Sequence, residues 1–310
     1  MASPHRSAGI ACDDLSLPEY KETMEAVLSC NVCQSGSIQK VDPQNNLCRC
    51  EACGYVFDSP RPTAAAVARF YSRPAKYDSW LKEEAGRDAL WRRRLNKLLP
   101  HKAEGNLLDI GAGIGQFLYH ARPFFTEVAG TEVSESAARI AKQKYGIDLL
   151  AGQIEELNLP PASFDNITLF HVLEHVPDPM RLLHRCCKLL RPHGVLAIAV
   201  PNDVLAWSAG IKKLGKRIGL RPFQKFSPEL GIACAGESRE IHLSHFTPTV
   251  LRKLVEGSGF EVVKKSLDPY YVASGMRLMF NSIYYGLHQM LHTVLRVNRY
   301  ETIWMIARKP

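Results

Sequence analysis

Residues 105–201 predict an α/β fold built on a mostly parallel sheet, and three observations support this. Short apolar runs recur at 107–110, 128–131, 148–151, 166–170 and 195–200. Helical patterns near 114–122, 134–145 and 178–190 lie between these runs, and such alternation is typical of a parallel sheet with crossover helices. A glycine-rich turn follows the first run, as expected where a buried strand passes directly into a helix.

The composition is that of a globular protein. The 310-residue chain has 46% hydrophobic and 23% charged residues and a net charge of +8, and its length suggests about two domains. Disordered, collagen-like and disulfide-stapled proteins are therefore excluded. No uncharged apolar run approaches the roughly 20 residues that a membrane-spanning helix needs. The first residues, MASPHRSAGIACDD, lack an apolar signal core, so we expect a cytoplasmic protein.

Four of the nine cysteines are spaced as metal ligands, in the pairs Cys30/Cys33 and Cys50/Cys53. Sixteen residues (34–49) separate the two C-x-x-C pairs, a spacing typical of a zinc ribbon. Because four thiolates complete a tetrahedral site, we expect a structural rather than a catalytic zinc. Cys48 is a further thiol that could compete with Cys50 as a ligand, and a redox dithiol is the alternative to zinc.

Changes of pattern along the chain divide it into four segments. We expect a tail at 1–27, the zinc ribbon at 28–60, a helical linker or lid at 61–104 and the α/β domain at 105–310. Two insertions interrupt this domain, a basic flap at 203–238 and a helical segment rich in Tyr, Leu and Met at 274–297. The stretch 301–309 has the pattern of a final edge strand.

The glycine-rich turn is the strongest motif. Asp109 ends the first strand, and Gly111-Ala112-Gly113-Ile114-Gly115 follows as G-x-G-x-G. The third glycine comes one residue earlier than in the G-x-G-x-x-G turn that cradles a dinucleotide. Glu132 closes the second strand, 23 positions after Asp109, where a carboxylate can accept hydrogen bonds from both hydroxyls of a ribose.

These motifs resemble those of class I S-adenosylmethionine (SAM) methyltransferases. The runs FDNITLFHVLEHVPDP (164–179) and LLRPHGVLAIAVPN (189–202) resemble the ubiquinone-biosynthesis O-methyltransferase group. The cysteine segment with RCEACGYVFDSPRP resembles bacterial methyltransferases that carry an N-terminal zinc-binding segment. The resemblance implies a Rossmann-like sheet of seven strands with flanking helices, whose last strand, 301–309, is antiparallel, plus a small zinc ribbon.

The resemblance also implies which residues hold SAM. The methionine half would lie against Asp109, Gly111, Ala112, Gly113 and Gly115. Glu132 and Val133 would hold the ribose, and Gln153 and Ile154 would face the adenine. Phe170 and His171 end the fourth strand, beside the expected position of the transferred methyl group.

Three histidines are candidates for the general base that a hydroxyl acceptor requires. His242 lies in REIHLSHFTP, which resembles the catalytic segment of sugar C-methyltransferases, although Arg239 and Ile241 replace the Tyr and Glu found there. His171 and His175 belong to the run His171-x-x-Glu174-His175. The side chains of His171, Glu174 and His175 could bind a metal, or His175 could serve as a hydrogen-bonded structural residue.

We therefore expect methyl transfer to a small molecule, on an oxygen of a secondary metabolite, a quinone or a sugar-linked acceptor. An RNA methyltransferase, a sugar C-methyltransferase and a non-catalytic module are alternatives. Nucleic acid is disfavoured, because only Lys40 and Arg49 are basic between the outer cysteines. Residues 203–226 carry six Lys and Arg against Asp203, which fits an anionic acceptor, a membrane surface or a solvated flap. The helical segment 274–297 fits a wall for an apolar tail, a core helix or a homodimer contact.

Overall fold

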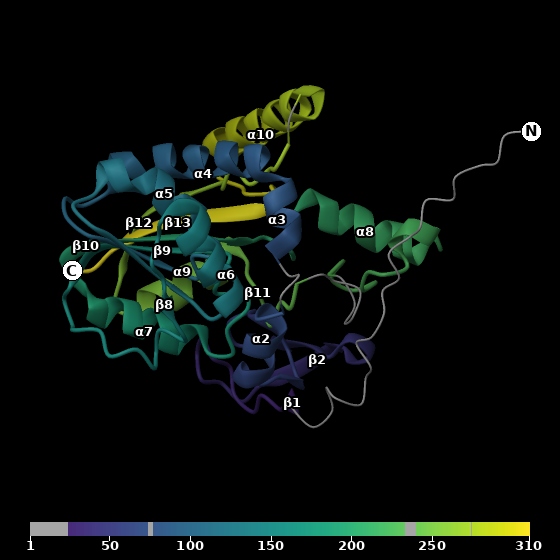
Figure 1. Ribbon diagram of the computed structural model, residues 1–310. Coiled ribbons are helices and arrows are strands. Elements are labelled where there is room, and N and C mark those ends of the chain that lie inside the picture. The colour runs from purple at the N-terminus through teal and green to yellow at the C-terminus, as the bar shows by residue number, and fades with distance from the viewer. Residues whose placement is uncertain (1–23, 74–76, 233–239, 274) are drawn as a thin grey trace, which may run out of the picture.

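The computed structural model describes residues 24–73, 77–232, 240–273 and 275–310 (Figure 1). Its centre is a seven-stranded sheet in the order β12-β13-β10-β9-β6-β7-β8. The strands are β6 (Leu107–Ile110), β7 (Val128–Glu132), β8 (Leu150–Ala151), β9 (Phe164–Phe170), β10 (Leu190–Pro201), β12 (Glu261–Ser266) and β13 (Thr302–Arg308). Strands β10, β9, β6, β7 and β8 run parallel, which confirms the predicted fold class.

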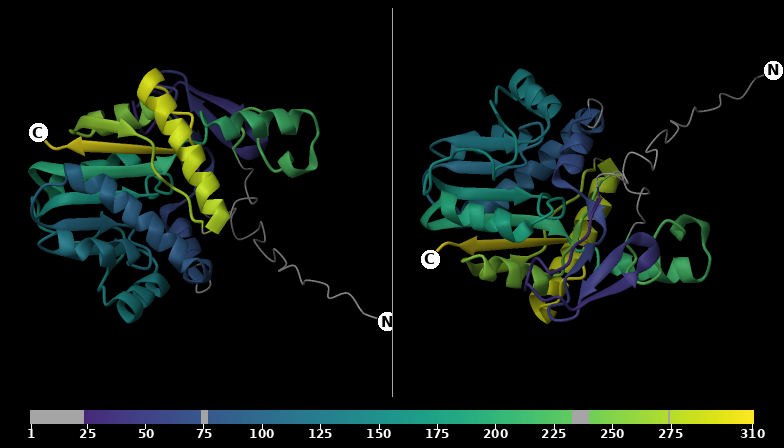
Figure 2. Two further views of the ribbon diagram at one scale, coloured as in Figure 1. Left: turned by 90° about the horizontal axis from the view of Figure 1, so that it is seen from above. Right: turned by 90° about the horizontal axis from the view of Figure 1, so that it is seen from below.

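Helices cover both faces of this sheet, as the views from above and from below show (Figure 2). One core joins alternate residues of β6, β9 and β10 to α7 (Pro179–Leu189) and α9 (Pro248–Gly257). The other core joins the intervening residues to α4 (Glu84–Leu98), α5 (Gln116–Ala121) and α6 (Glu135–Ile140). The alternation follows from the two-residue period of a strand, which sends Leu107 to one face and Leu108 to the other.

The last strand corrects one prediction, because β13 is not an edge strand. It pairs antiparallel with β10 on one side and with β12 on the other, so that β12 forms the edge. Six of the seven residues of β13 are buried, whereas most of β12 is exposed. The continuous apolar run IWMIA (303–307) is typical of a strand covered on both faces, so the pattern itself indicated an inner position.

The cysteine segment forms a second sheet in the order β11-β4-β3-β2. Its strands are β2 (Ile38–Asp42), β3 (Leu47–Cys50), β4 (Val56–Asp58) and β11 (Ser244–His245). The fourth strand therefore comes from a part of the chain that lies beyond the predicted ribbon, at residues 244–245. A two-stranded ladder pairs β1 (Met24–Glu25), which precedes the cysteine segment, with β5 (Arg61–Pro62), which follows it.

The remaining helices lie around these sheets. They are α2 (Ala64–Tyr71), α3 (Asp78–Lys82), α8 (Trp207–Arg217) and α10 (Gly275–Leu295), with short 3-10 turns at 43–45, 99–101, 122–124 and 221–223 and a π-helical turn at 141–145. The predicted flap therefore contains a helix, α8, and its described end packs on the ribbon through Leu230 and Ile232. Its residues 233–238, Arg239 and most of the predicted tail lie outside the described residues.

Candidate functional site

The glycine turn after β6 is tightly packed between strand β7 and Trp80. The N–H groups of Gly111 and Ala112 both donate to the carbonyl oxygen of Thr131 at 2.9 Å, which ties the turn to β7. Gly113 has a φ of +55°, and a Cβ at this position would lie 2.8 Å from Cζ3 of Trp80. Only glycine therefore fits here, both for its backbone conformation and for the space above it.

Glu132 lies directly beside this turn. Its carboxylate accepts hydrogen bonds from the N–H of Gly113 at 2.8 Å and of Ser134 at 3.0 Å. Tyr77 also hydrogen-bonds with it. The side chain is 5% exposed, and burial raises its pKa although these hydrogen bonds oppose the shift. A buried acceptor held at the mouth of a glycine turn suits the hydroxyl groups of a ribose.

Asp109 ends β6 beneath the turn. Its carboxylate accepts a hydrogen bond from the hydroxyl of Thr168 at 2.6 Å. Burial raises the pKa of Asp109 to about 7, against the hydrogen bond from Thr168 and the charge of Arg94. Arg94 is itself fully buried and is neutralised by Asp268. Its Nε donates to Oδ1 of Asp268 at 3.0 Å, and its Nη2 donates to Oδ2 at 2.5 Å.

The other predicted cofactor residues lie along the same edge of the sheet. Strands β9, β6, β7 and β8 are neighbours, and their carboxyl ends carry Phe170 and His171, the glycine turn, Glu132 and Val133, and Gln153 and Ile154 in that order. Ligands of open parallel sheets bind outside these carboxyl ends. The structure thus places all the predicted cofactor residues at one edge of the sheet.

Two residues missed by the sequence analysis lie beside the turn. Trp80 packs on Gly113, and the guanidinium of Arg87 lies 3.9 Å from the centroid of the Trp80 ring. Arg87 is 7% exposed, its Nε has no described hydrogen-bond partner, and Glu83 approaches only to 3.7 Å. Burial accordingly lowers its pKa. A buried cation with so little compensation is suited to a carboxylate ligand.

A histidine cluster lies between the two sheets. The oxygen Oδ2 of Asp203 lies 3.3 Å from Nδ1 of His242 and 3.4 Å from Nδ1 of His245. Nε2 of His245 lies 3.2 Å from Oδ1 of Asp58, on β4 of the ribbon sheet. Burial opposes protonation of His245, yet its hydrogen bonds to the two carboxylates prevail and raise its pKa to about 9.

His242 differs from His245 in having a free ring nitrogen. Its Nδ1 faces Asp203, and Nε2 has no hydrogen-bond partner among the described residues. Burial opposes protonation of His242, but the hydrogen bond to Asp203 prevails and raises its pKa. The two imidazoles in turn hold the pKa of Asp203 far below its usual range, against the effect of burial.

Glu174 forms the other side of this cluster and is fully buried. Its Oε1 lies 2.9 Å from Nδ1 of His171 and 3.8 Å from Nε2 of His175. Nδ1 of His175 lies 2.9 Å from the hydroxyl of Tyr71 and 2.5 Å from the carbonyl oxygen of Ile241. Burial lowers the pKa of His175, so this ring is neutral near pH 7.

The cluster does not form the metal set considered from the sequence. His171 is hydrogen-bonded to Glu174, and the three ligand atoms that lie within 4.8 Å of one another belong to Glu174, His175 and His242 instead. Asp203, His242 and His245 form a second such set. Hydrogen bonds hold the second set together, since His245 uses both ring nitrogens for carboxylates, whereas no hydrogen bond among the described residues joins the side chains of Glu174, His175 and His242 to one another.

The four predicted zinc ligands lie together in the ribbon. The sulfurs of Cys30 and Cys53 are 3.5 Å apart, as are those of Cys33 and Cys50, and all four lie within 4.8 Å of one another. These spacings are close to the edge of about 3.8 Å expected for a tetrahedron with zinc–sulfur bonds of about 2.3 Å. Cys48 lies outside the group, with its sulfur 3.8 Å from the carbonyl oxygen of Ser59.

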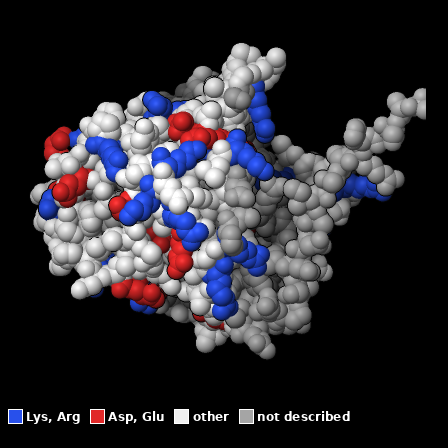
Figure 3. Space-filling model, viewed as in Figure 1, with Lys and Arg blue, Asp and Glu red and all other residues white. Residues whose placement is uncertain are grey.

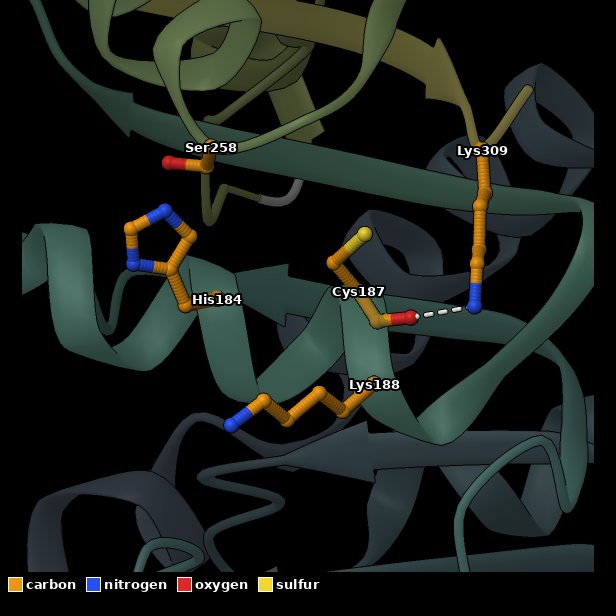
Figure 4. A pocket seen from close by; sticks show the side chains of 5 residues that line it. All are labelled: His184, Cys187, Lys188, Ser258 and Lys309. Atoms are coloured by element: carbon orange, nitrogen blue, oxygen red, sulfur yellow. Dashed lines mark hydrogen bonds between the residues drawn. The ribbon is translucent and has the colours of Figure 1, made fainter.

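A surface depression elsewhere on the molecule shares no residue with these clusters (Figure 4). It is open to solvent and is lined by His184, Cys187, Lys188, Ser258 and Lys309. The ammonium group of Lys309 donates a hydrogen bond to the carbonyl oxygen of Cys187 at 2.7 Å, which ties the residues after β13 to α7. These contacts serve packing, so the depression is not a candidate active site.

A family described as "Methyltransferase domain" matches residues 83–265, more than half of the chain. A Mycolicibacterium smegmatis protein named "Probable S-adenosylmethionine-dependent methyltransferase" is 28% identical over 53% of this chain and 55% of its own length. "Ubiquinone biosynthesis O-methyltransferase" from Idiomarina loihiensis is 28% identical over 54% of this chain and 72% of its own. The same enzyme from Coxiella burnetii is 34% identical over 31% and 44%. The chain thus spans about half the length of several curated relatives.

Solved structures support the fold alone, because their sequence identities are low. The crystal structure of the cyclase SpnF is similar with a TM-score of 0.53 and 17% identity, over 81% of this chain and 98% of that one. A chain of the Haloferax volcanii complex that contains the Trm112 methyltransferase activator gives a TM-score of 0.50 and 15% identity, over 76% and 97%.

Proposed function

Since this chain belongs to the methyltransferase domain family, we propose that it transfers a methyl group from SAM to a small-molecule acceptor. The observation that carries the proposal is Glu132, held beside a glycine turn at the carboxyl edge of four neighbouring strands. Oxygen is the acceptor atom that we propose first, because two of the relatives above are named O-methyltransferases.

Residues at this edge fit the parts of SAM one by one. Gly113 has a positive φ and no room for a Cβ beside Trp80, so the turn offers backbone rather than a side chain to the methionine half. Glu132 would accept the ribose hydroxyls, and Gln153 and Ile154 would face the adenine. Arg87 would bind the carboxylate of the methionine half, which accounts for a buried guanidinium whose Nε is unpaired among the described residues and whose contact with Glu83 is as long as 3.7 Å. SAM supplies a methyl group on a sulfonium, already activated for in-line attack.

His242 is the general base in this proposal. Asp203 holds its Nδ1, which fixes the tautomer that leaves Nε2 to take a proton from an acceptor hydroxyl. His245 stays protonated between Asp203 and Asp58, so its positive charge offsets that of Asp203 and limits the rise in the pKa of His242. His171 and His175 would act by holding Glu174 in place between them.

Carbon is a second candidate acceptor atom, favoured by one observation. The sugar C-methyltransferases that resemble residues 239–248 cluster a Tyr, a Glu and a His. Here the hydroxyl of Tyr71 donates to Glu240 at 3.0 Å and lies 2.9 Å from His175, so a comparable cluster forms from other positions. Incubation with radiolabelled SAM and either phenols or nucleotide-linked ketosugars would separate the two, since label enters only the correct acceptor class.

The cysteine group is proposed to bind one structural zinc ion. The spacing of the four sulfurs fits tetrahedral coordination, and the N–H of Val32 points at Cys30 with a distance of 3.4 Å. Burial raises the pKa of Cys53 to about 11 when no cation is present, so a bound zinc ion would be needed to hold this thiolate. All four ligand positions are filled by sulfur, and none is left for a substrate.

Calorimetry with S-adenosylhomocysteine tests the proposed function. Glu132→Ala should weaken binding by about tenfold or more, because two hydrogen bonds to a carboxylate are lost. Glu127 lies just before the same strand and is exposed, so Glu127→Ala is the matched control and should bind normally. Failure of the unaltered protein to bind the ligand would refute the proposal.

A further inference from the structure

Helix α8 carries a continuous apolar stripe that faces solvent. Trp207, Ile211, Leu214 and Ile218 are 60%, 57%, 61% and 62% exposed. Their spacing of four, three and four residues places them on one side of a helix. Side chains of this size are rarely left in water along a whole helix, so the stripe indicates a surface that something covers.

The opposite side of α8 attaches the helix to the molecule. Ala209 is buried there, with Gly231 packed against its backbone, and Gly215 is buried on a flank of the helix against the ring of Phe223. The N–H of Trp207 donates to the carbonyl oxygen of Arg299 at 2.9 Å. Figures 1 and 2 show α8 projecting on the side opposite the C-terminus. Packing of the buried side of α8 against the rest of the molecule therefore keeps the apolar stripe facing solvent.

Among the described residues of the flap, the charge around this stripe is almost entirely positive. The basic residues of the segment 203–226 are Lys212, Lys213, Lys216, Arg217, Arg221 and Lys225. Asp203 is engaged by His242 and His245, and Glu229 lies 3.9 Å from Arg217. By contrast, basic and acidic side chains are interspersed over α4, α5 and α6 (Figure 3). Apolar and basic character thus coincide at α8, which is the pattern of helices that lie in a membrane interface.

Helix α10 carries a second exposed apolar side. Met276, Phe280, Ile283, Leu287, Met290 and Val294 are each at least 53% exposed along its outer side. The segment 275–300 contains no acidic residue. The loop after α10 meets the start of α8, where the guanidinium of Arg299 donates to the carbonyl oxygen of Leu205 at 3.2 Å. None of the described helices is long and apolar enough to cross a bilayer.

We propose that α8 docks this protein on the surface of a bilayer that contains anionic lipids. Its apolar stripe would enter the interface, and the surrounding Lys and Arg would contact the phosphates. A second copy of the chain fits less well, because a two-fold contact through α8 would bring the same basic residues face to face. Helix α8 begins four residues after Asp203, so docking also places the candidate active site near the lipid.

Vesicle flotation with the full chain tests this proposal. Vesicles of phosphatidylcholine with phosphatidylglycerol should bind the protein, those of phosphatidylcholine alone should bind it far less, and added salt should release it. The double variant Ile211→Glu, Leu214→Glu should bind at least about tenfold more weakly. Phe124 is 44% exposed beside α5, so Phe124→Glu is the matched control and should bind as the unaltered chain does.

A second measurement guards against misfolding of the double variant. Addition of the anionic vesicles should shift the tryptophan emission to the blue, and the shift should be lost in the milder variant Trp207→Phe. Equal flotation of the double variant and the unaltered protein would overturn the proposal. So would a dimer in the absence of lipid that this double variant converts to a monomer, since a second copy would then cover the stripe.

Discussion

The cofactor edge and the histidine cluster lie close together but are built in different ways. The glycine turn of the cofactor edge is local, because Asp109, Gly111, Gly113 and Gly115 belong to one strand and the turn that follows it. The histidine cluster is assembled from distant parts of the chain. It takes Asp58 from the ribbon, Glu174 from the loop after β9, Asp203 from the loop after β10, and His242 from the stretch before β11.

This difference makes the ribbon a support of the candidate base. Strand β4 pairs with β11, with Phe57 opposite Ser244 and Val56 opposite His245. The hydroxyl groups of Tyr55 and Ser244 lie 2.5 Å apart. The cofactor edge does not depend on the ribbon in this way. Damage to the ribbon should therefore impair methyl transfer while cofactor binding is retained.

Loss of one zinc ligand should therefore have the largest effect on turnover. Cys50→Ser is expected to release the metal, disorder β4 and β11 and abolish methyl transfer, while S-adenosylhomocysteine still binds within about twofold. Cys187 lies outside the ribbon, so Cys187→Ser should retain both properties. Elemental analysis should find one zinc per unaltered chain, and full turnover without metal would contradict the account.

Removal of the base should be the next largest effect. His242→Gln is expected to lower kcat by about 10²–10⁴, because proton removal loses its acceptor, without a change in the affinity for S-adenosylhomocysteine. His184 is exposed on α7, and His184→Gln should leave kcat unchanged. A kcat near that of the unaltered protein would exclude His242 as the base.

Disruption of the glycine turn should give the converse result. Gly113→Val is expected to weaken binding of S-adenosylhomocysteine by about a hundredfold, because its side chain meets Trp80 and its φ is unfavourable. The NMR signals of His242 and His245 should keep their positions. Gly36 has nothing within 4 Å of an added Cβ, so Gly36→Val is the control. Unchanged affinity of the Gly113 variant would place the cofactor elsewhere.

Titration of His245 should give the smallest effect, on stability. Its pKa is about 9 in the folded chain against an ordinary value of 6.5, so its charge stabilises the fold fully below pH 6.5. This stabilisation, on the order of 3 kcal/mol, should fade as the pH rises through 9. Denaturant unfolding between pH 6.5 and 9 should show a decline that His245→Gln lacks. Parallel curves for the two proteins would show that His245 is not charged.

Sequence patterns predicted the parts of the molecule that depend on local order. The strand and glycine turn at 107–115 and the helix at 179–189 follow from periodicity and from glycine placement within one segment. The same reasoning failed for β13, whose neighbours are decided by the packing of the whole sheet.

The histidine cluster was predicted only in part. His171, His175 and His242 were recognised from motifs, and His245 lies in the same motif as His242, but the carboxylate partners Asp58 and Asp203 were not predicted. The contact between Asp58 and His245 joins residues 187 positions apart, and no local pattern records it. Asp203 did carry a signal that was overlooked, because it follows the carboxyl end of β10, where ligand-facing residues of parallel sheets lie. Arg87 carried no signal beyond its place in a basic helix.

A crystal structure with S-adenosylhomocysteine tests the central claim most directly. The account predicts that the amino-acid half lies against Gly111 and Gly113, with both ribose hydroxyls within hydrogen-bond distance of Glu132. Density for the ligand at another edge of the sheet, or an empty edge after soaking at saturating concentration, would contradict it.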